Sequence, residues 1–319
     1  MRPELILIVL VSLFSCASRT KITKPFFYKV TKGEQTIHIL GTAHVGMLLE
    51  DFPAAVKNEI TRSELVALEA DEGTRESAKI LAKMEADKLF ERWKEPYPNL
   101  VAKLKPKTWE HLKYTLSIGE VQTYVQGLGI DHSLSELHPT AILVIFEHFR
   151  KENAEYYFHP DVINSYSVYS IKSIEEQASL ELDLEIQKLA EDSKISVLGL
   201  DDARQATKAI MQDPEDYILG MIEGIFGNGS RKSHESLQEL QKAYRSGDEG
   251  AILKYADDSE INKEQLLYDR NRYWFDQLNH KDEKNIFVAV GALHLVGEQS
   301  LLSFLADRGY KVQRLENLK

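Results

Sequence analysis

The sequence predicts an α/β fold: a central, mainly parallel sheet with flanking helices and a large helical insertion at about residues 75–190. Two observations predict the sheet. Short apolar, β-branched runs recur along the chain, and helical segments separate these runs. A third observation predicts the insertion: Ala, Lys, Glu and Leu dominate residues 76–94, and helical periodicity recurs at residues 140–150 and 174–191. The length of 319 residues suits one large domain or two ordinary ones.

The first predicted elements are a hairpin and a strand–helix–strand unit. Residues 26–30 and 35–40 are β-rich, and a glycine-containing turn separates them, which is typical of a hairpin. A helix follows, which we expect Asp51 to cap and in which Pro53 lies near the first turn. Residues 63–70 then form a strand, so the βαβ unit implies parallel pairing and a right-handed crossover.

The chain after the insertion again alternates strands with helices, and it ends on a strand. Periodicity and turn residues predict these elements in the same way as in the first half. They are a strand at 195–200, the start of a helix at 201–205, a loop at 227–234, a helix at 261–279, a strand at 286–290, a helix at 298–308 and a strand at 310–315.

The N-terminus predicts an exported protein. A short polar start at residues 1–4 precedes the apolar run 5–14, whose length suits the hydrophobic region of a signal peptide. A membrane-spanning helix needs about 20 apolar residues instead. The run ends in Leu13-Phe14-Ser15-Cys16, which resembles the lipobox of bacterial lipoproteins, in which the cysteine carries lipid after cleavage. An ordinary secretory signal with an incidental Cys16 is the alternative.

The lipoprotein interpretation divides the chain into a signal peptide at 1–15, a tether at 16–26 and an α/β domain at 27–318. Cys16 is the single cysteine, so a lipid on it anchors the chain to a membrane and leaves no thiol for a disulfide. Ala17-Ser18 provide no acidic retention residue, which by resemblance to lipoprotein sorting predicts the outer membrane, facing the periplasm.

Composition and charge exclude one class of partner. Hydrophobic residues make up 43% of the chain and charged residues 28%, which is typical of a globular protein. The net charge is -11, from 50 acidic and 39 basic residues, so the field of the protein repels phosphate backbones. We therefore expect no nucleic-acid partner.

A repeated Gly-x-x-His turn is the strongest sign of a functional site. Gly41-Thr42-Ala43-His44 and Gly291-Ala292-Leu293-His294 each follow an apolar strand and precede a helix and another strand. Glycine allows a sharp turn there, and sites in open α/β sheets lie beyond the carboxyl ends of the strands. Glu69 ends the strand after the first unit, so we expect it at the same edge. The structural alternatives are a loop histidine bonded to backbone and, for Glu69, a solvated strand end.

Two histidines and a carboxylate at one edge can hold a divalent metal. Imidazole and carboxylate are normal ligands of zinc, manganese and cobalt, so His44, Glu69 and His294 are the expected metal ligands. A bound metal lowers the pKa of its water and generates a nucleophile. Without a metal, the same three groups can act as general base and general acid.

Four blocks along the chain also resemble a known family. They are Ile39-Leu40-Gly41-Thr42-Ala43-His44-Val45-Gly46 with Leu65-Val66-Ala67-Leu68-Glu69, Leu198-Gly199-Leu200-Asp201 with Gln205, Arg270-Asn271, and Val290-Gly291-Ala292-Leu293-His294-Leu295-Val296-Gly297 with Gly309-Tyr310-Lys311-Val312. In this order they resemble the TraB/GumN family, which includes the Tiki proteases that cleave Wnt ligands. The resemblance covers about residues 26–315, and it implies a metal-dependent peptidase with a peptide or protein substrate.

The resemblance adds Arg270 and Asp201 to the expected catalytic residues His44, Glu69 and His294. Arg270 either stabilises an oxyanion, or orients Glu69, or forms an ordinary helix salt bridge. Asp201 stands where the family pattern usually has glutamate, so its carboxylate reaches about one methylene less far. It either takes part directly or caps the following helix.

The sequence excludes two common hydrolase types, because it contains neither the Gly-x-Ser-x-Gly elbow nor the His-Glu-x-x-His helix. Five histidines of the helical region lack metal-ligand spacing, and we expect structural roles for them: His111, His132, His138, His148 and His159. The expected function is an exported, metal-dependent hydrolase of the peptidase type. Two alternatives stay open: a protein that binds and sequesters a peptide without cutting it, and an ester or lactone hydrolase.

Overall fold

The computed structural model describes residues 22, 24–43, 47–162, 182–211, 214–227, 239–258 and 263–316. The fold class is α/β, as the sequence predicts, with one six-stranded sheet in the strand order β4-β3-β5-β2-β1-β6 and helices around it. The strands are β1 (Phe27–Lys32), β2 (Gln35–Thr42), β3 (Leu65–Leu68), β4 (Ser196–Gly199), β5 (Asn285–Gly291) and β6 (Lys311–Arg314). β1 runs in the opposite direction to the other five strands, so it is antiparallel to β2 and β6. The remaining pairs are parallel, and the sheet is mainly parallel.

The six strands lie within a few residues of their predicted positions, but one part of the predicted topology is wrong. β2 and β3 are parallel without being neighbours, because β5 lies between them. Val288 of β5 is in register with Ile39 on one side and with Ala67 on the other. β5 is buried from Ile286 to Gly291, on both faces of the sheet, and an apolar parallel strand of this kind is favoured at the centre, where helices cover both faces.

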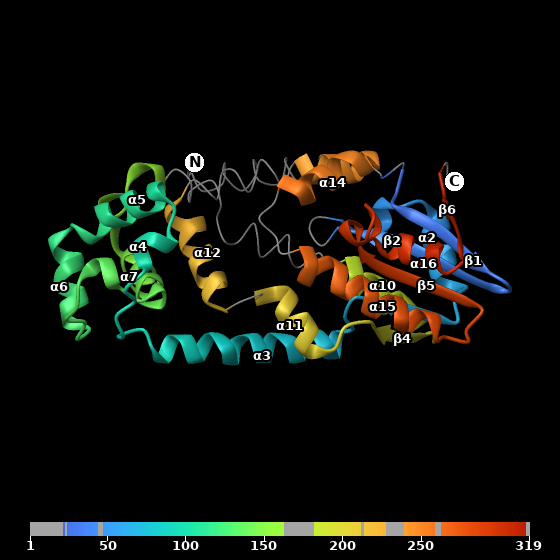
Figure 1. Cartoon of the computed structure of the whole chain (residues 1–319), viewed down its shortest axis with the longest axis horizontal. Helices are drawn as coiled ribbons and strands as arrows, with labels where there is room; N and C mark the ends of the chain where they lie inside the picture. The colour runs from blue at the N-terminus through green and yellow to red at the C-terminus, as the bar shows by residue number, and fades with distance from the viewer. Residues whose placement is uncertain are drawn as a thin grey trace, which may run out of the picture.

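The helices that pack on the sheet form the α/β lobe, on the right in Figure 1. The prediction that Asp51 caps the helix after β2 is wrong, because the residue before this helix is Pro53. The Asp51 carboxylate accepts a hydrogen bond from the Leu48 amide at 3.0 Å and closes a 3-10 turn, and Pro53 separates this turn from the helix. The elements of this lobe are η1 (Leu49–Asp51), α2 (Ala54–Thr61), α10 (Leu182–Asp192), α14 (Glu249–Asp258), the π turn η3 (Glu264–Tyr268), α15 (Asp269–Asn279), η4 (Ala292–Leu295) and α16 (Leu301–Asp307).

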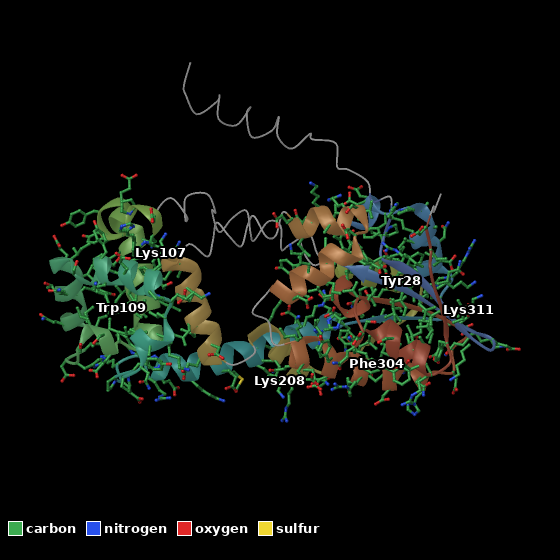
Figure 2. The ribbon with its side chains drawn as sticks, turned by 45° about the horizontal axis from the view of Figure 1, so that its top comes forward. Tyr28, Lys107, Trp109, Lys208, Phe304 and Lys311 are labelled. Atoms are coloured by element: carbon green, nitrogen blue, oxygen red, sulfur yellow. The ribbon has the colours of Figure 1, made fainter. Side chains whose placement is uncertain are left out.

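A helical lobe with its own hydrophobic core lies at the other end of the molecule, and α3 (Glu72–Glu91) runs between the two lobes (Figure 1). α11 (Ala203–Met211) packs along α3. Figure 2 shows Lys208 of α11 between the lobes, with Trp109 in the helical lobe and Phe304 in the α/β lobe. The helical lobe consists of α4 (Leu100–Lys103), α5 (Pro106–Leu116), α6 (Gly119–Gly127), η2 (Leu134–Glu136), α7 (Pro139–Tyr157) and α12 (Pro214–Phe226).

The helical lobe and the predicted insertion at 75–190 overlap but do not coincide. α12 comes from the chain after β4, yet it completes the helical core, because Ile222 and Phe226 are buried in contact with α7. α10 lies at the end of the predicted insertion but packs against the sheet, through Leu182 and Ile186. Two separate stretches of chain therefore build the helical lobe.

Several predictions concern residues outside the described ones. The predicted signal peptide, Cys16, most of the tether and most of the loop at 227–234 belong to this part of the chain, and so does His44. Among the helices that the structure describes, none is both long and apolar enough to cross a membrane.

Candidate active site

The carboxyl ends of the parallel strands place two acidic residues and a histidine at one edge of the sheet. Glu69 comes directly after β3, Asp201 comes shortly after β4, and His294 lies in η4 at the end of β5. Backbone hydrogen bonds continue the pairing of β3 and β4 beyond the strands, since the Asp201 amide donates to the Glu69 carbonyl at 2.7 Å. Because parallel strands end at the same edge, the two acids lie side by side.

The side chain of Arg270 joins these two acids. Its Nη2 lies 2.5 Å from Glu69 Oε2 and 2.7 Å from Asp201 Oδ2, and its Nε also donates to Asp201 Oδ2 at 3.1 Å. Its Nη1 donates to the carbonyl of Leu266 at 3.2 Å and lies 3.3 Å from His294 Nε2. All five guanidinium N–H groups therefore have an acceptor nearby. This arrangement leaves no donor for an oxyanion, so it favours the role of Arg270 in orienting the acids.

The position of Arg270 follows from the helix that carries it. The π turn η3 leads directly into α15, and π turns occur frequently at functional sites. One helical turn after Arg270, Trp274 Nε1 donates to Asp201 Oδ1 at 2.7 Å. The guanidinium lies over the ring of Trp274, 4.5 Å from its centroid. Arg270 and Trp274 thus hold Asp201 from one face of one helix.

The two acids share a single positive charge in buried surroundings. Glu69 and Asp201 are 8% and 4% exposed. Burial raises the pKa of Asp201 against the opposing effects of Arg270 and Trp274, and the charge of Glu69 adds to the increase. Burial by itself would lower the pKa of Arg270, but Glu69 and Asp201 outweigh it and raise the pKa, so the guanidinium stays charged.

His294 presents its Nε2 toward Glu69. Its Nδ1 lies 2.8 Å from Asn271 Oδ1, and Asn271 Nδ2 donates to the carbonyl of Gln299 at 2.8 Å, which sets the orientation of the amide. Asn271 Oδ1 is therefore the acceptor and His294 Nδ1 the donor, so Nε2 of the neutral ring carries a lone pair. This nitrogen lies 3.7 Å from Glu69 Oε1.

The glycines of the two Gly-x-x-His turns contribute through a backbone amide and through their small size. Neither Gly41 nor Gly291 has a positive φ, and the change of direction after Gly291 is made by the 3-10 turn η4. The Gly291 amide instead donates to Glu69 Oε1 at 2.6 Å. A Cβ on Gly41 would lie 2.8 Å from Phe26 Cβ, so glycine is required there by close packing.

The helix cap considered for Asp201 belongs to its neighbour Asp202. The Gln205 amide donates to Asp202 Oδ1 at 2.8 Å, and the Asp202 amide donates to Gln205 Oε1 at 3.0 Å, which forms a capping box at the start of α11. The carboxylate of Asp201 binds Arg270 and Trp274 instead, so it belongs to the site.

Sequence reasoning named Asn271 within a family block without giving it a role, and it missed two other buried residues, Trp274 and Tyr244. Asn271 and Trp274 follow Arg270 on α15, and the i, i+4 spacing of Trp274 from Arg270 was the available signal. Tyr244 donates to the carbonyl of Gly41 at 2.6 Å, and burial raises the pKa of Tyr244. Its local sequence contains no sign of this contact, because the partner lies on a distant strand.

Two of the predicted metal ligands, His294 and Glu69, lie within the described part of this edge and have donor atoms suited to a divalent metal. His294 Nε2 and Glu69 Oε1, at 3.7 Å, are near the separation of about 3.0–3.5 Å expected for two ligands of one zinc ion. Asn271, behind His294 Nδ1, is the kind of outer contact that orients a metal-bound histidine. Arg270 Nη1, 3.3 Å from His294 Nε2, opposes a cation and would have to give up this contact. The third predicted ligand, His44, lies outside the described residues.

Comparison with known protein families gives a match over nearly the whole chain. The model of the TraB/PrgY/gumN family matches residues 26–314. This range contains every block on which the resemblance in the sequence rests, from the strand before His44 to the segment after Gly309. A search among curated proteins found no match.

Proposed function

The chain belongs to the TraB/PrgY/gumN family, and we propose that it is a metal-dependent hydrolase that cleaves peptide or protein substrates. His294, Glu69 and His44 surround the reactive centre in this proposal, and Arg270 and Asp201 position Glu69. The observation that carries it is the approach of the His294 Nε2 lone pair to 3.7 Å from the Glu69 carboxylate, at a buried strand edge.

The described residues suit hydrolysis because each has a defined state and position. His294 Nε2 carries a lone pair when neutral, so it can hold a metal or accept a proton from water. Both oxygens of Glu69 are bound, Oε1 by the Gly291 amide and Oε2 by Arg270. Groups that are already fixed need little reorganisation as charge develops near them. A divalent ion bound at this edge would supply Lewis acidity and lower the pKa of a bound water to about 7.

Metal content and turnover of a peptide library test the proposal, with the soluble chain that begins at residue 19. The wild type is expected to bind about one divalent ion at this edge. We expect His294→Gln and Glu69→Gln to stay folded and to lose at least about 100-fold in turnover, because each removes a group that contacts the reacting atoms. His280→Gln is the matched control, since His280 is exposed at the end of α15 in the same lobe. Full turnover in folded His294→Gln would refute the proposal.

Peptide binding without cleavage is the competing function, and one observation favours it. Arg270 binds a carboxylate oxygen of both acids within the protein, so each acid has a hydrogen-bond partner without a ligand. A sequestering protein would cleave nothing even with manganese or cobalt added, and it would keep its peptide affinity in His294→Gln. Ester and lactone substrates, included in the same assay, distinguish an esterase from a peptidase.

We also propose that the chain is exported and anchored by a lipid on Cys16 to the outer membrane, facing the periplasm. The support is the apolar run at 5–14, which overlaps the motif Leu13-Phe14-Ser15-Cys16 at its end. In cell fractionation, the wild type is expected with the outer membrane, and Cys16→Ser is expected to leave it. If both forms are found in the soluble periplasmic fraction, an ordinary secretory signal is the correct interpretation.

A further inference from the structure

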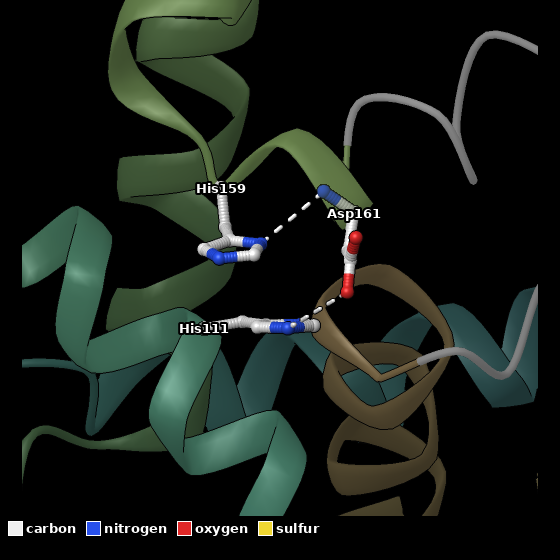
Figure 3. A group of neighbouring side chains, drawn as sticks. All are labelled: His111, His159 and Asp161. Carbon is white, nitrogen blue, oxygen red and sulfur yellow. Dashed lines mark hydrogen bonds and ion pairs between the residues drawn. The ribbon is translucent and has the colours of Figure 1, made fainter.

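Three residues of the helical lobe gather away from the candidate active site: His111, His159 and Asp161 (Figure 3). One ligand-type atom from each residue lies within 4.8 Å of the other two. His111 belongs to α5, whereas His159 and Asp161 follow the end of α7. His111 and His159 are 48 positions apart in the sequence, which explains why they do not show metal-ligand spacing.

The ring of His111 is held in the orientation typical of a metal-bound histidine. Its Nδ1 lies 2.5 Å from the carbonyl of Phe226 at the end of α12, which can only accept, so Nδ1 carries the proton of the neutral ring. The lone pair on Nε2 then faces Asp161 Oδ2 at 3.6 Å. A divalent ion between this lone pair and the carboxylate would be attracted to both.

The ring of His159 stacks on that of His111, with centroids 4.4 Å apart and planes inclined by 14° (Figure 3). The Asp161 amide donates to His159 Nδ1 at 3.2 Å, so the neutral ring carries its proton on Nε2. Metal binding to His159 therefore breaks this amide hydrogen bond in either case: an ion on Nδ1 takes its lone pair, and an ion on Nε2 moves the ring proton to Nδ1. Lys107 Nζ lies 3.4 Å from Asp161 Oδ2 and competes for the same carboxylate.

We propose that His111, His159 and Asp161 form a site for one zinc-like divalent ion, separate from the candidate active site. Two imidazoles and one carboxylate select borderline transition ions over magnesium or calcium. Two ligands of a tetrahedral zinc ion are about 3.3 Å apart, so the 3.6 Å between His111 Nε2 and Asp161 Oδ2 needs little adjustment. Asp161 is 48% exposed, which lets an ion enter from solvent and keeps a coordination position for water.

The ion in this site joins three segments of the helical lobe. His111 brings in α5, His159 and Asp161 bring in the segment after α7, and the carbonyl of Phe226 adds the end of α12 through the ring of His111. Because a bound ion stabilises only the folded arrangement, its effect is a rise in the melting temperature of this lobe.

A cobalt titration of the full, metal-depleted chain tests the proposal, with visible absorption and equilibrium dialysis as readouts. The wild type is expected to bind one more Co²⁺ than His159→Gln or Asp161→Asn, with the tetrahedral absorption band, and Zn²⁺ is expected to displace it. Each variant is expected to weaken this binding at least about 10-fold. Zn²⁺ should raise the melting temperature of the wild type but not that of Asp161→Asn. Both changed side chains are partly or largely exposed, so the variants are expected to fold.

Two further variants separate this site from other sources of bound metal. His148→Gln is the matched control, because His148 is an exposed histidine of α7 outside the cluster, and it should keep the full binding. His294→Gln changes the candidate active site alone and should also keep the cobalt band. The proposal is overturned if Asp161→Asn binds as much Co²⁺ as the wild type, or if the band disappears in His294→Gln and not in Asp161→Asn. Lys107, 3.4 Å from Asp161 Oδ2, is then the cation that pairs with this carboxylate.

Discussion

Replacement of Arg270 by methionine tests the buried charge cluster directly. Methionine is of similar length but carries no charge, so Glu69 and Asp201 lose the partner that they share at 2.5 Å and 2.7 Å. Removal of one partner from a buried ion pair costs about 3–5 kcal/mol. The acids can limit this cost by taking up a proton. From an ordinary carboxyl pKa of about 3.9, protonation at pH 7 costs about 4 kcal/mol. We therefore expect Arg270→Met to lose about 4 kcal/mol of unfolding free energy.

Urea unfolding at neutral pH, followed by tryptophan fluorescence, measures this loss in the lobe that contains the site. Trp274 lies in the α/β core, whereas Trp93 and Trp109 pack on the core of the helical lobe. A background with Trp93→Phe and Trp109→Phe makes the signal specific for the α/β lobe. Circular dichroism of the same samples shows whether the helical lobe unfolds separately.

Arg272→Met is the matched control on the same helix. Arg272 pairs with Glu264 and Asp269, but its side chain is 45% exposed, so its loss is expected to cost at most about 1 kcal/mol. If Arg270→Met costs no more than Arg272→Met, the acids do not depend on a buried partner and the reasoning is refuted.

Three further predictions concern single contacts of the site. Asn271→Ala removes the acceptor that fixes the tautomer of His294, and we expect metal affinity or turnover to fall about 10–100-fold in a folded protein; unchanged values in a metal titration and peptide assay would contradict this. Gly41→Ala places a Cβ 2.8 Å from Phe26 Cβ and is expected to cost about 1–3 kcal/mol in urea unfolding, and wild-type stability would contradict the close packing. Because the pKa of Asp201 is raised in the folded state, its contribution to stability is fully present below about pH 3.9 and is lost as the pH rises through the raised pKa. Asp201→Asn should remove this loss, so its stability relative to the wild type should rise as the pH increases above about 4; a constant difference would contradict the shift.

The sequence by itself determined the features that local patterns control. Apolar, β-branched runs between turn residues specify the six strands to within a few residues. Helical periodicity specifies helices such as α3, α7 and α15, whereas α12 and α14 were not predicted. The common edge of Glu69 and His294 also follows from the sequence, because both come at the carboxyl ends of strands that run parallel. The order of the family blocks along the chain then identified the family that the match over residues 26–314 confirms.

Only the tertiary structure decided which residues that are distant in the sequence contact one another. The central place of β5, the contact of Arg270 with both Glu69 and Asp201, and the cluster around His111 each depend on how complete helices and strands pack. The helix cap is a local feature instead, since Gln205 stands three residues after Asp202 and completes a capping box with it. Periodicity records which face of a segment is buried, whereas the partner on that face is selected by the free energy of packing the whole chain.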